Sequence, residues 1–492
     1  MEKYFEAFRR HIIGIDHEIQ TPYHQNIPIV YADWTASGRA YNLIEKKIQH
    51  DLLPYVANTH TETNETGMKM TNAYHQAREI IKAHVNASEE DVLISCGSGM
   101  TGAISKFQRI LGIKVHESFK TQISLADVDR PVVFITHMEH HSNQTSWLET
   151  IAEVVIIPPA ENGLVSVANF EALLEQYADR PTKIAAVTSC SNVTGIMTPY
   201  HEIAKIIHQH GGLCFVDFAC SAPYVTMDMH PSEEGAHLDA IYFSPHKFLG
   251  GPGSAGVVIF NKKLYKNSIP DHPGGGTVTW TDPWGGHAYI RDIETREDGG
   301  TPGFLQTIRT AMAIKLKEKM TVSAIMDREH ELLNQIWRGL EPIKNLHVFA
   351  SEHKKRLGVI SFYIDDLHYI AGVKLLNDRF GIQVRGGCSC AGTYGHYLFQ
   401  VDQEESKEVR DQIVAGDCSR KPGWIRLSIH PTTSDHEMQY ILSSIQQLAQ
   451  NHKVWMQDYD MNYTTGTIKH KTASKASASK RIISEILETG YL

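Results

Sequence analysis

The stretch from residue 183 to residue 260 contains four apolar, β-rich runs: KIAAVTS (183–189), LCFVDFA (213–219), AIYFS (240–244) and AGVVIF (255–260). Three similar runs precede it: DVLIS (91–95), VVFITHM (132–138) and EVVIIPP (153–159). Helical patterns separate most of these runs, and strands that alternate with helices are typical of a parallel sheet covered on both faces. The sequence therefore predicts an α/β fold with a mainly parallel, doubly wound sheet of seven strands.

The segment between the first and second of these four runs shows the helical pattern most clearly. Ile203, Ile206 and Ile207 recur at positions i, i+3 and i+4. This spacing places all three side chains on one side of a helix. We expect that helix to cover one face of the sheet, with the isoleucines in the core.

The pattern changes beyond residue 300. A long helical run, GFLQTIRTAMAIKLKEKM (303–320), is followed by shorter runs such as GVISFYI (358–364) and HYIAGVKLLND (368–378). These runs predict a smaller C-terminal α/β domain. The end of the chain is rich in Lys, Ser, Thr and Ala, which is typical of a solvated linker, here followed by a short helix. The expected organisation is an N-terminal segment that packs on the small domain (1–27), a large domain (28–300), a small domain (301–455) and a polar, flexible tail (456–492).

Composition excludes several classes of protein. A net charge of −9 with 42% hydrophobic residues describes a soluble globular protein without the basic excess that favours nucleic-acid binding. The first residues, MEKYFEAFRRHIIG, lack the apolar centre of a signal peptide, and no run approaches the roughly 18 apolar residues of a membrane span. We expect a cytoplasmic protein that binds neither membrane nor nucleic acid. Its seven cysteines do not suggest a disulfide framework.

Two strand ends carry residues that could take part in catalysis. Lys247 follows AIYFS and precedes a glycine turn, and Asp217 lies at the end of the preceding run. A lysine at a strand end is usually a solvated surface charge. In a pyridoxal phosphate enzyme, by contrast, a lysine reacts with the cofactor as a neutral amine. A carboxylate there keeps the pyridinium nitrogen protonated, so that the ring accepts electrons. The two positions together favour a pyridoxal phosphate enzyme.

A glycine loop follows the first strand. Gly97, Gly99 and Gly102 form a G-x-G-x-x-G pattern between a strand and a helix, where backbone N–H groups can hold a phosphate. A dinucleotide fold also requires an acidic residue about 20 residues further on, at the end of the next strand, and the chain has a helix and a polar loop there. A single phosphate needs only the helix N-terminus and a hydroxyl, which Ser98 supplies.

Polar side chains follow two further strands. His140 and His141 are adjacent, so only one can face a site at the strand end, where an imidazole could stack on a flat cofactor and transfer protons. The alternative is a half-buried histidine with a backbone partner. Asn192, in SNVTG, could donate to a phenolic oxygen, although asparagine is also common in turns.

The loop VRGGCSCAG (384–392) contains Cys388 and Cys390, and the apolar run WIRLS contains Arg426. C-x-C can be half of a zinc site, but no second close cysteine pair exists, so no metal is expected. A flexible glycine-rich loop suits a moving nucleophile. The planar guanidinium of Arg426 matches a substrate carboxylate, and a structural salt bridge is the alternative.

These motifs, taken together and in this order, resemble the class V aminotransferase family of fold-type I pyridoxal phosphate enzymes, in particular its cysteine desulfurase and selenocysteine lyase branch. The resemblance covers about residues 28 to 450. The motifs that carry it are VYADWTASGRA, MEHHSN, SNVTG, VDFA, FSPHK, GGTPG, VRGGCSCAG and IRLS.

The resemblance implies a role for each matching residue. Lys247 would be the Schiff-base lysine and Asp217 the partner of the pyridinium nitrogen. His140 would stack on the ring and act in catalysis, and Asn192 would bond the phenolic oxygen and contact the substrate.

It also implies a phosphate site. Ser98, Gly99, Ser244 and His246 would hold the phosphate, and Thr301 would reach it from the other subunit of a homodimer.

For the substrate, the resemblance implies that Arg426 binds the carboxylate of an amino acid. Cys390 would take sulfur from L-cysteine as a persulfide, releasing L-alanine, and a protein could then accept the sulfur. The chain has Cys220 where many members have a glutamine. An aminotransferase, epimerase or C–S lyase without a cysteine nucleophile is the alternative within the family, and a non-catalytic metal-binding protein is the alternative outside it.

Overall fold

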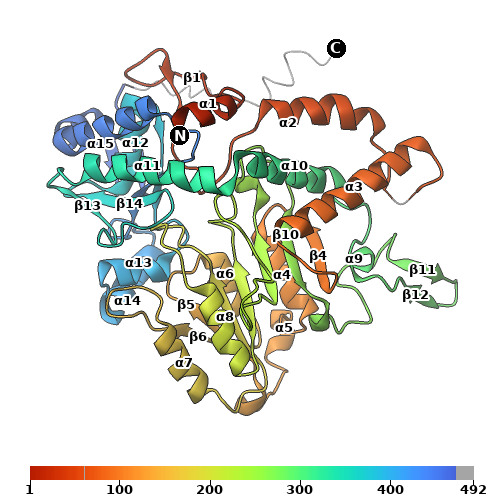
Figure 1. Cartoon of the computed structure of the whole chain (residues 1–492). Helices are drawn as coiled ribbons and strands as arrows, with labels where there is room; N and C mark the ends of the chain where they lie inside the picture. The colour runs from red at the N-terminus through yellow and green to blue at the C-terminus, as the bar shows by residue number, and fades with distance from the viewer. Residues whose placement is uncertain (60, 473–492) are drawn as a thin grey trace.

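The computed structural model describes residues 1–59 and 61–472 (Figure 1). Its centre is a seven-stranded sheet in which only β10 runs antiparallel to its neighbours. The predicted α/β fold with a mainly parallel sheet is therefore confirmed. In spatial order the strands are β4 (Asp91–Cys96), β10 (Gly256–Asn261), β9 (Ala240–Phe243), β8 (Leu213–Asp217), β7 (Lys183–Thr188), β5 (Val132–Thr136) and β6 (Glu153–Ile157).

Helices cover both faces of this sheet, because alternate side chains of each strand belong to different cores. Val132 and Phe134 of β5 pack in one core, whereas Val133 and Ile135 pack in the other. On the predicted helix α8, Ile203 and Ile207 are fully buried in the first core. The helices of the first core are α3 (Glu65–His84), α7 (Val167–Gln176), α8 (Tyr200–Gln209) and α10 (Phe304–Met320); those of the second are α4 (Met100–Ile110) and α6 (His141–Leu148).

The C-terminal part of the chain contains a second, smaller sheet with four antiparallel strands. Its strand order is β13 (Leu346–Val348), β14 (Val359–Ile364), β17 (Trp424–Ser428) and β16 (Arg385–Gly387). Ile425 and Leu427 of β17 pack with helices α11 (Val322–Leu340), α12 (Tyr369–Phe380) and α15 (Asp435–Trp455). Trp424, which precedes Ile425 and so faces the other side of the strand, packs in the core of the large sheet instead. The strand therefore presents Trp424 and Arg426 to the larger sheet.

The N-terminal residues contact the small domain. In α1 (Glu2–Arg9), the Arg9 guanidinium lies 2.6 Å from the Glu437 carboxylate of α15. Strand β3 (Val30–Tyr31), which the sequence placed in the large domain, pairs in parallel with β15 (Ile382–Gln383) of the small domain. The chain thus crosses the small domain before it enters the large one.

Two hairpins lie outside these sheets. One pairs β11 (Val278–Thr281) with β12 (His287–Tyr289). The other pairs β18 (Tyr459–Asn462) with β19 (Thr467–His470), at the start of the region that the sequence predicted to be a polar, flexible tail (456–492). The buried Tyr459 hydroxyl donates to Asp378 at 2.9 Å, an anchor that composition does not reveal. The predicted short helix at the end of the tail lies outside the described residues.

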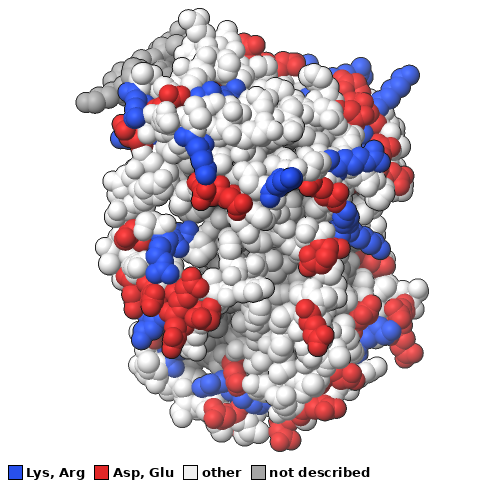
Figure 2. All heavy atoms as spheres, turned by 90° about the vertical axis from the view of Figure 1, so that its left-hand side faces the viewer, with Lys and Arg blue, Asp and Glu red and all other residues white. Residues whose placement is uncertain are grey.

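The remaining elements include β1 (Glu18–Ile19), β2 (Ile27–Pro28), α2 (Asn42–Lys47), α5 (Glu117–Lys120), α9 (Ile293–Arg296), α13 (Gly392–Phe399) and α14 (Gln403–Val414). Among the described residues, no helix has both the length and the apolar character needed to cross a bilayer. Acidic and basic side chains are interspersed on the face that Figure 2 presents, which includes the small domain.

Candidate active site

A cavity of about 200 Å³ lies at the carboxyl ends of the central parallel strands, where the small domain meets the large sheet. Loops after parallel strands converge at such an edge, so residues that are distant in sequence become neighbours. Most of the residues selected from the sequence line this cavity: His140, Asn192, Asp217, Ser244, His246, Lys247, Cys390 and Arg426.

Lys247 and Asp217 come from adjacent strands. Lys247 ends a short turn after β9, and Asp217 is the last residue of β8. Burial lowers the pKa of Lys247 below its ordinary value, which favours the neutral amine. Burial also raises the pKa of Asp217 to about 6, although the carboxylate accepts a hydrogen bond from the Ala219 N–H at 2.8 Å. A cation bound beside Asp217 would favour its charged form.

His140 faces the cavity, whereas His141 does not line it. His140 caps the N-terminus of α6, where its Nδ1 accepts a hydrogen bond from the Ser142 N–H at 3.1 Å. Nδ1 therefore carries no hydrogen. Burial and the nearby Lys247 lower the pKa of His140 to about 3, so the ring is neutral at pH 7.

The N-terminus of α4 forms one end of the cavity. Ser244 Oγ accepts a hydrogen bond from the Met100 N–H at 2.9 Å, and His246 Nδ1 lies 2.9 Å from the Ser98 carbonyl. A Cβ atom at Gly99 would lie 3.0 Å from the His246 ring and 3.2 Å from Ser244 Oγ, so any side chain there would crowd this end of the cavity. Free N–H groups at such a helix start suit an anion.

Two hydroxyl groups that sequence reasoning missed also lie here. Thr101 Oγ1 and Ser142 Oγ are 2.8 Å apart and both residues line the cavity. Their position in the sequence could have indicated them, because each lies in the first turn of a helix that follows one of the motifs described above. Ser98 and Thr301 are exposed and do not line the cavity of this chain.

Asn192 connects the cavity to the cysteine loop. Its Nδ2 donates to the Ser389 carbonyl at 2.7 Å. Its Oδ1 is buried and has no hydrogen-bond partner. A buried polar atom without a partner is costly, which is consistent with a site that a bound molecule completes.

The loop that carries Cys390, for which the sequence predicted flexibility, makes hydrogen bonds to several other elements. The His141 N–H donates to the Cys390 carbonyl at 2.7 Å, and the Gly392 N–H donates to His141 Nε2 at 2.9 Å. The Trp424 indole N–H donates to Ser389 Oγ at 3.1 Å. These partners come from distant parts of the chain, so loop composition does not indicate them. Ser389 and Cys390 both have positive φ angles, 51° and 56°.

Arg426 makes a salt bridge, which was the alternative reading, and it also lines the cavity; its contact with a substrate carboxylate stays a prediction. Its Nη2 lies 2.6 Å from Asp33 Oδ1, and its Nη1 donates to the Asn192 carbonyl at 3.2 Å. Its Nε is buried without a partner. Asp33 follows β3 and belongs to the motif VYADWTASGRA, so this salt bridge brings that N-terminal motif into contact with the strand that carries Arg426. A second arginine that sequence reasoning left without a role, Arg385, also lines the cavity.

The other cysteines have different surroundings. Cys220, at the position where glutamine is common in the family, lines the cavity with its Sγ 3.8 Å from that of Cys190. Cys388 packs against the core of the large sheet and does not line the cavity. Among the described residues, no cysteine belongs to a group that could hold a metal ion.

The sequence model of the aminotransferase class-V family matches residues 30–441, from β3 into α15. The chain belongs to the class-V aminotransferase family. Members of this family are pyridoxal phosphate enzymes, so the predicted family and enzyme class are confirmed.

Several relatives of this class-V aminotransferase family member carry more specific names. A probable cysteine desulfurase of Halalkalibacterium halodurans is 29% identical over 368 residues, which are 74% of this chain and 84% of the relative. A probable cysteine desulfurase of Staphylococcus epidermidis is 29% identical over 371 residues, again 74% and 84%.

Solved structures show the same fold. An apo cysteine desulfurase of Thermococcus onnurineus superposes with a TM-score of 0.69 at 22% identity and covers 88% of this chain and 99% of its own. The cysteine desulfurase CsdA of Escherichia coli gives a TM-score of 0.69 at 18% identity, with 91% and 98% covered.

Proposed function

We propose that this class-V aminotransferase family member is a cysteine desulfurase, which converts L-cysteine into L-alanine and receives the sulfur on Cys390 as a persulfide. The observation that carries the proposal is that Cys390 lines the same cavity as Lys247, Asp217 and Arg426. The similarity to probable cysteine desulfurases supports it.

The cavity fits pyridoxal phosphate. Lys247 would bind the cofactor covalently, Asp217 would lie at the ring nitrogen, and the flat, neutral ring of His140 would stack on the cofactor. Asn192 would bond the phenolic oxygen. The close approach of His246 and Ser244 to Gly99, which any side chain there would crowd, supports this assignment.

The start of α4 would hold the phosphate. Ser98 and Gly99 would contribute main-chain N–H groups, and Ser244 and His246 would contribute side chains, because these residues surround the first turn of the helix. Thr301 is exposed in a single chain. Thr301 of the partner subunit would complete the phosphate site in a homodimer.

The residues divide the first part of the reaction among themselves. Arg426 would bind the substrate carboxylate. Lys247, whose pKa burial lowers, would remove the proton from the substrate Cα once the substrate amino group has displaced it from the cofactor. Bound pyridoxal phosphate supplies an electron sink for the electrons of that Cα–H bond. Asp217 would keep the ring nitrogen protonated and so maintain this electron sink.

Cys390 carries out the second part. Its thiolate attacks the substrate sulfur, so that a new S–S bond forms while the Cβ–S bond breaks. The electron pair of the broken bond stays with the carbon skeleton, which takes up protons and leaves as alanine. Cys390 retains the sulfur as a persulfide until a thiol, such as that of an acceptor protein, removes it. The cytoplasmic location expected from the sequence remains a prediction.

The deciding experiment compares Cys390→Ser with Cys388→Ser in protein loaded with pyridoxal phosphate. The two cysteines belong to one loop, but only Cys390 lines the cavity. We expect Cys390→Ser to abolish persulfide and alanine formation from L-cysteine while the visible absorbance of the lysine-bound cofactor persists. The Cys388→Ser variant should still form both the persulfide and alanine. Undiminished alanine formation by Cys390→Ser would instead indicate a family member without a cysteine nucleophile.

A further inference from the structure

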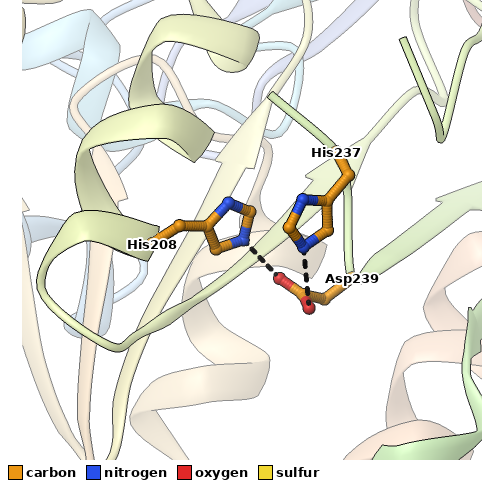
Figure 3. A group of neighbouring side chains, drawn as sticks. All are labelled: His208, His237 and Asp239. Carbon is orange, nitrogen blue, oxygen red and sulfur yellow. Dashed lines mark hydrogen bonds and ion pairs between the residues drawn. The ribbon is translucent and has the colours of Figure 1, made fainter. Parts of the chain in front are cut away.

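A second group of reactive side chains lies away from the active site. His208, His237 and Asp239 bring one ligand atom each within 4.8 Å of one another (Figure 3). His208 lies near the end of α8, and Asp239 directly precedes β9. The active-site cavity lies at the carboxyl end of β9, so this group occupies the opposite edge of the large sheet.

The orientation of His208 is determined by a backbone contact. Its Nδ1 lies 2.6 Å from the Gly235 carbonyl, which can only accept a hydrogen bond, so Nδ1 carries the hydrogen. Nε2 of the neutral ring is then a bare acceptor, and it lies 2.9 Å from Asp239 Oδ2. Two acceptors at this separation require a proton or a metal ion between them.

The Asp239 carboxylate and its loop are also held. Asp239 Oδ2 accepts a hydrogen bond from the Cys214 N–H at 2.8 Å. The loop before Asp239 is attached to α8, because His201 Nδ1 lies 2.8 Å from the Ala236 carbonyl and Lys205 pairs with Glu233 at 2.6 Å. The contact of His208 Nδ1 with the Gly235 carbonyl is typical of a metal ligand, because metal-ligating histidines usually donate their second N–H to a carbonyl, which orients the ring before the metal binds.

His237 supplies the adjustable third ligand. Its ring stacks on that of His208 with centroids 4.0 Å apart, and its Nε2 lies 3.9 Å from Asp239 Oδ1. Its side chain is 47% exposed, so the ring can turn toward an ion.

The spacing suits a small divalent ion. Zinc binds histidine nitrogen and carboxylate oxygen at about 2.0–2.2 Å, so tetrahedral ligands lie roughly 3.3 Å from one another. The separations of 2.9 and 3.9 Å lie on either side of that value. Two imidazoles and one carboxylate match zinc better than magnesium or calcium, which prefer all-oxygen ligands.

We propose that His208, His237 and Asp239 form a zinc-binding site, with water in the remaining position, that joins α8 to the loop before β9. The ion stabilises the fold and takes no part in the reaction. The rival occupant is a proton shared between His208 and Asp239.

The test is a zinc titration of the full-length holoenzyme after treatment with a chelator, followed by calorimetry and by thermal unfolding. We expect one bound zinc ion per chain at this site and a rise of the unfolding temperature by about 3 °C or more. His237→Ala should lower this zinc affinity by about ten-fold or more, and Asp239→Asn should remove the stabilisation. Magnesium should have neither effect.

The neighbouring His210→Ala serves as the matched control, because His210 lies at the C-terminal end of α8 and is not part of the cluster. The titration is repeated in Cys390→Ser protein, so that zinc on that thiol is not counted. Equal zinc affinity and stabilisation in the wild type and His237→Ala, or no zinc binding in the wild type, would overturn the proposal and leave the shared proton as the occupant.

Discussion

The carbonyl oxygen of Cys390 accepts a hydrogen bond from the main-chain N–H of His141 at 2.7 Å. The side chain of the same histidine accepts a hydrogen bond from Gly392 at 2.9 Å, so His141 holds both sides of Ala391 in the loop. Its neighbour His140 lines the cavity. One turn at the start of α6 therefore positions both the imidazole proposed to stack on the cofactor and the proposed nucleophile.

The first prediction concerns the hydrogen bonds between His141 and the Cys390 loop. His141→Ala removes the acceptor for the Gly392 N–H, at a cost of about 1 kcal/mol, and loosens the loop. We expect persulfide formation on Cys390 to slow about five-fold or more, whereas cofactor absorbance stays unchanged. Rapid-quench measurement of the persulfide checks this result. His141→Gln, which retains a side-chain acceptor, should recover part of the rate, and an unchanged rate in His141→Ala would contradict the positioning role.

The second prediction concerns Arg426. Arg426→Lys replaces the planar fork by a point charge, which cannot bond Asp33, the Asn192 carbonyl and a substrate carboxylate together. Loss of a charged hydrogen bond of about 1.5–3 kcal/mol should raise the KM for L-cysteine about 10- to 100-fold. Steady-state kinetics of alanine formation measure this change. Arg420→Lys, at an exposed arginine outside the cavity, is the control, and an unaltered KM in Arg426→Lys would exclude the proposed carboxylate site.

The third prediction concerns Asp217. Asp217→Asn retains an oxygen for the Ala219 N–H but removes the charge that keeps the ring nitrogen protonated. Alanine formation should fall by about 100-fold or more, since proton positioning of this kind contributes on that scale. Cofactor content, measured after denaturation, should stay close to that of the wild type. If the variant holds its cofactor and retains full activity, the carboxylate does not support the electron sink.

The fourth prediction concerns stability in acid. His430 is fully buried and stacked on Trp34 with ring centroids 4.3 Å apart, and burial lowers its pKa to about 3. Between that value and the ordinary pKa of about 6.5, the unfolded chain binds a proton that the folded chain does not bind. The free energy of unfolding therefore decreases as the pH is lowered through this range. At about 1.4 kcal/mol per pKa unit, this residue alone lowers the free energy of unfolding by about 2 kcal/mol at pH 5.

His430→Gln provides the measurement for that prediction. The variant should be less stable than the wild type at pH 8, because it loses packing against Trp34. From pH 8 to pH 5, however, it should lose about 2 kcal/mol less than the wild type in denaturant unfolding. Parallel pH curves for the two proteins would show that His430 does not contribute to the acid sensitivity.

Part of this molecule was predictable because the relevant signals are local. Seven apolar runs with helical patterns between most of them predicted the large sheet, since β-rich runs and helical periodicity depend on near neighbours. Arg426 was also correctly placed on a strand. The hairpin at Tyr459 was missed because its anchor, Asp378, is distant in the chain and the surrounding composition is that of a linker.

The sequence by itself determined the fold class, the family motifs and the identity of most residues that line the cavity. Only the tertiary structure decided how these residues relate: that Arg426 pairs with Asp33, that His141 holds the Cys390 loop, and that His208 meets Asp239. The physical reason is that secondary structure follows from short-range periodicity, whereas the partner of a polar group depends on which strand ends and loops the folded sheets bring together.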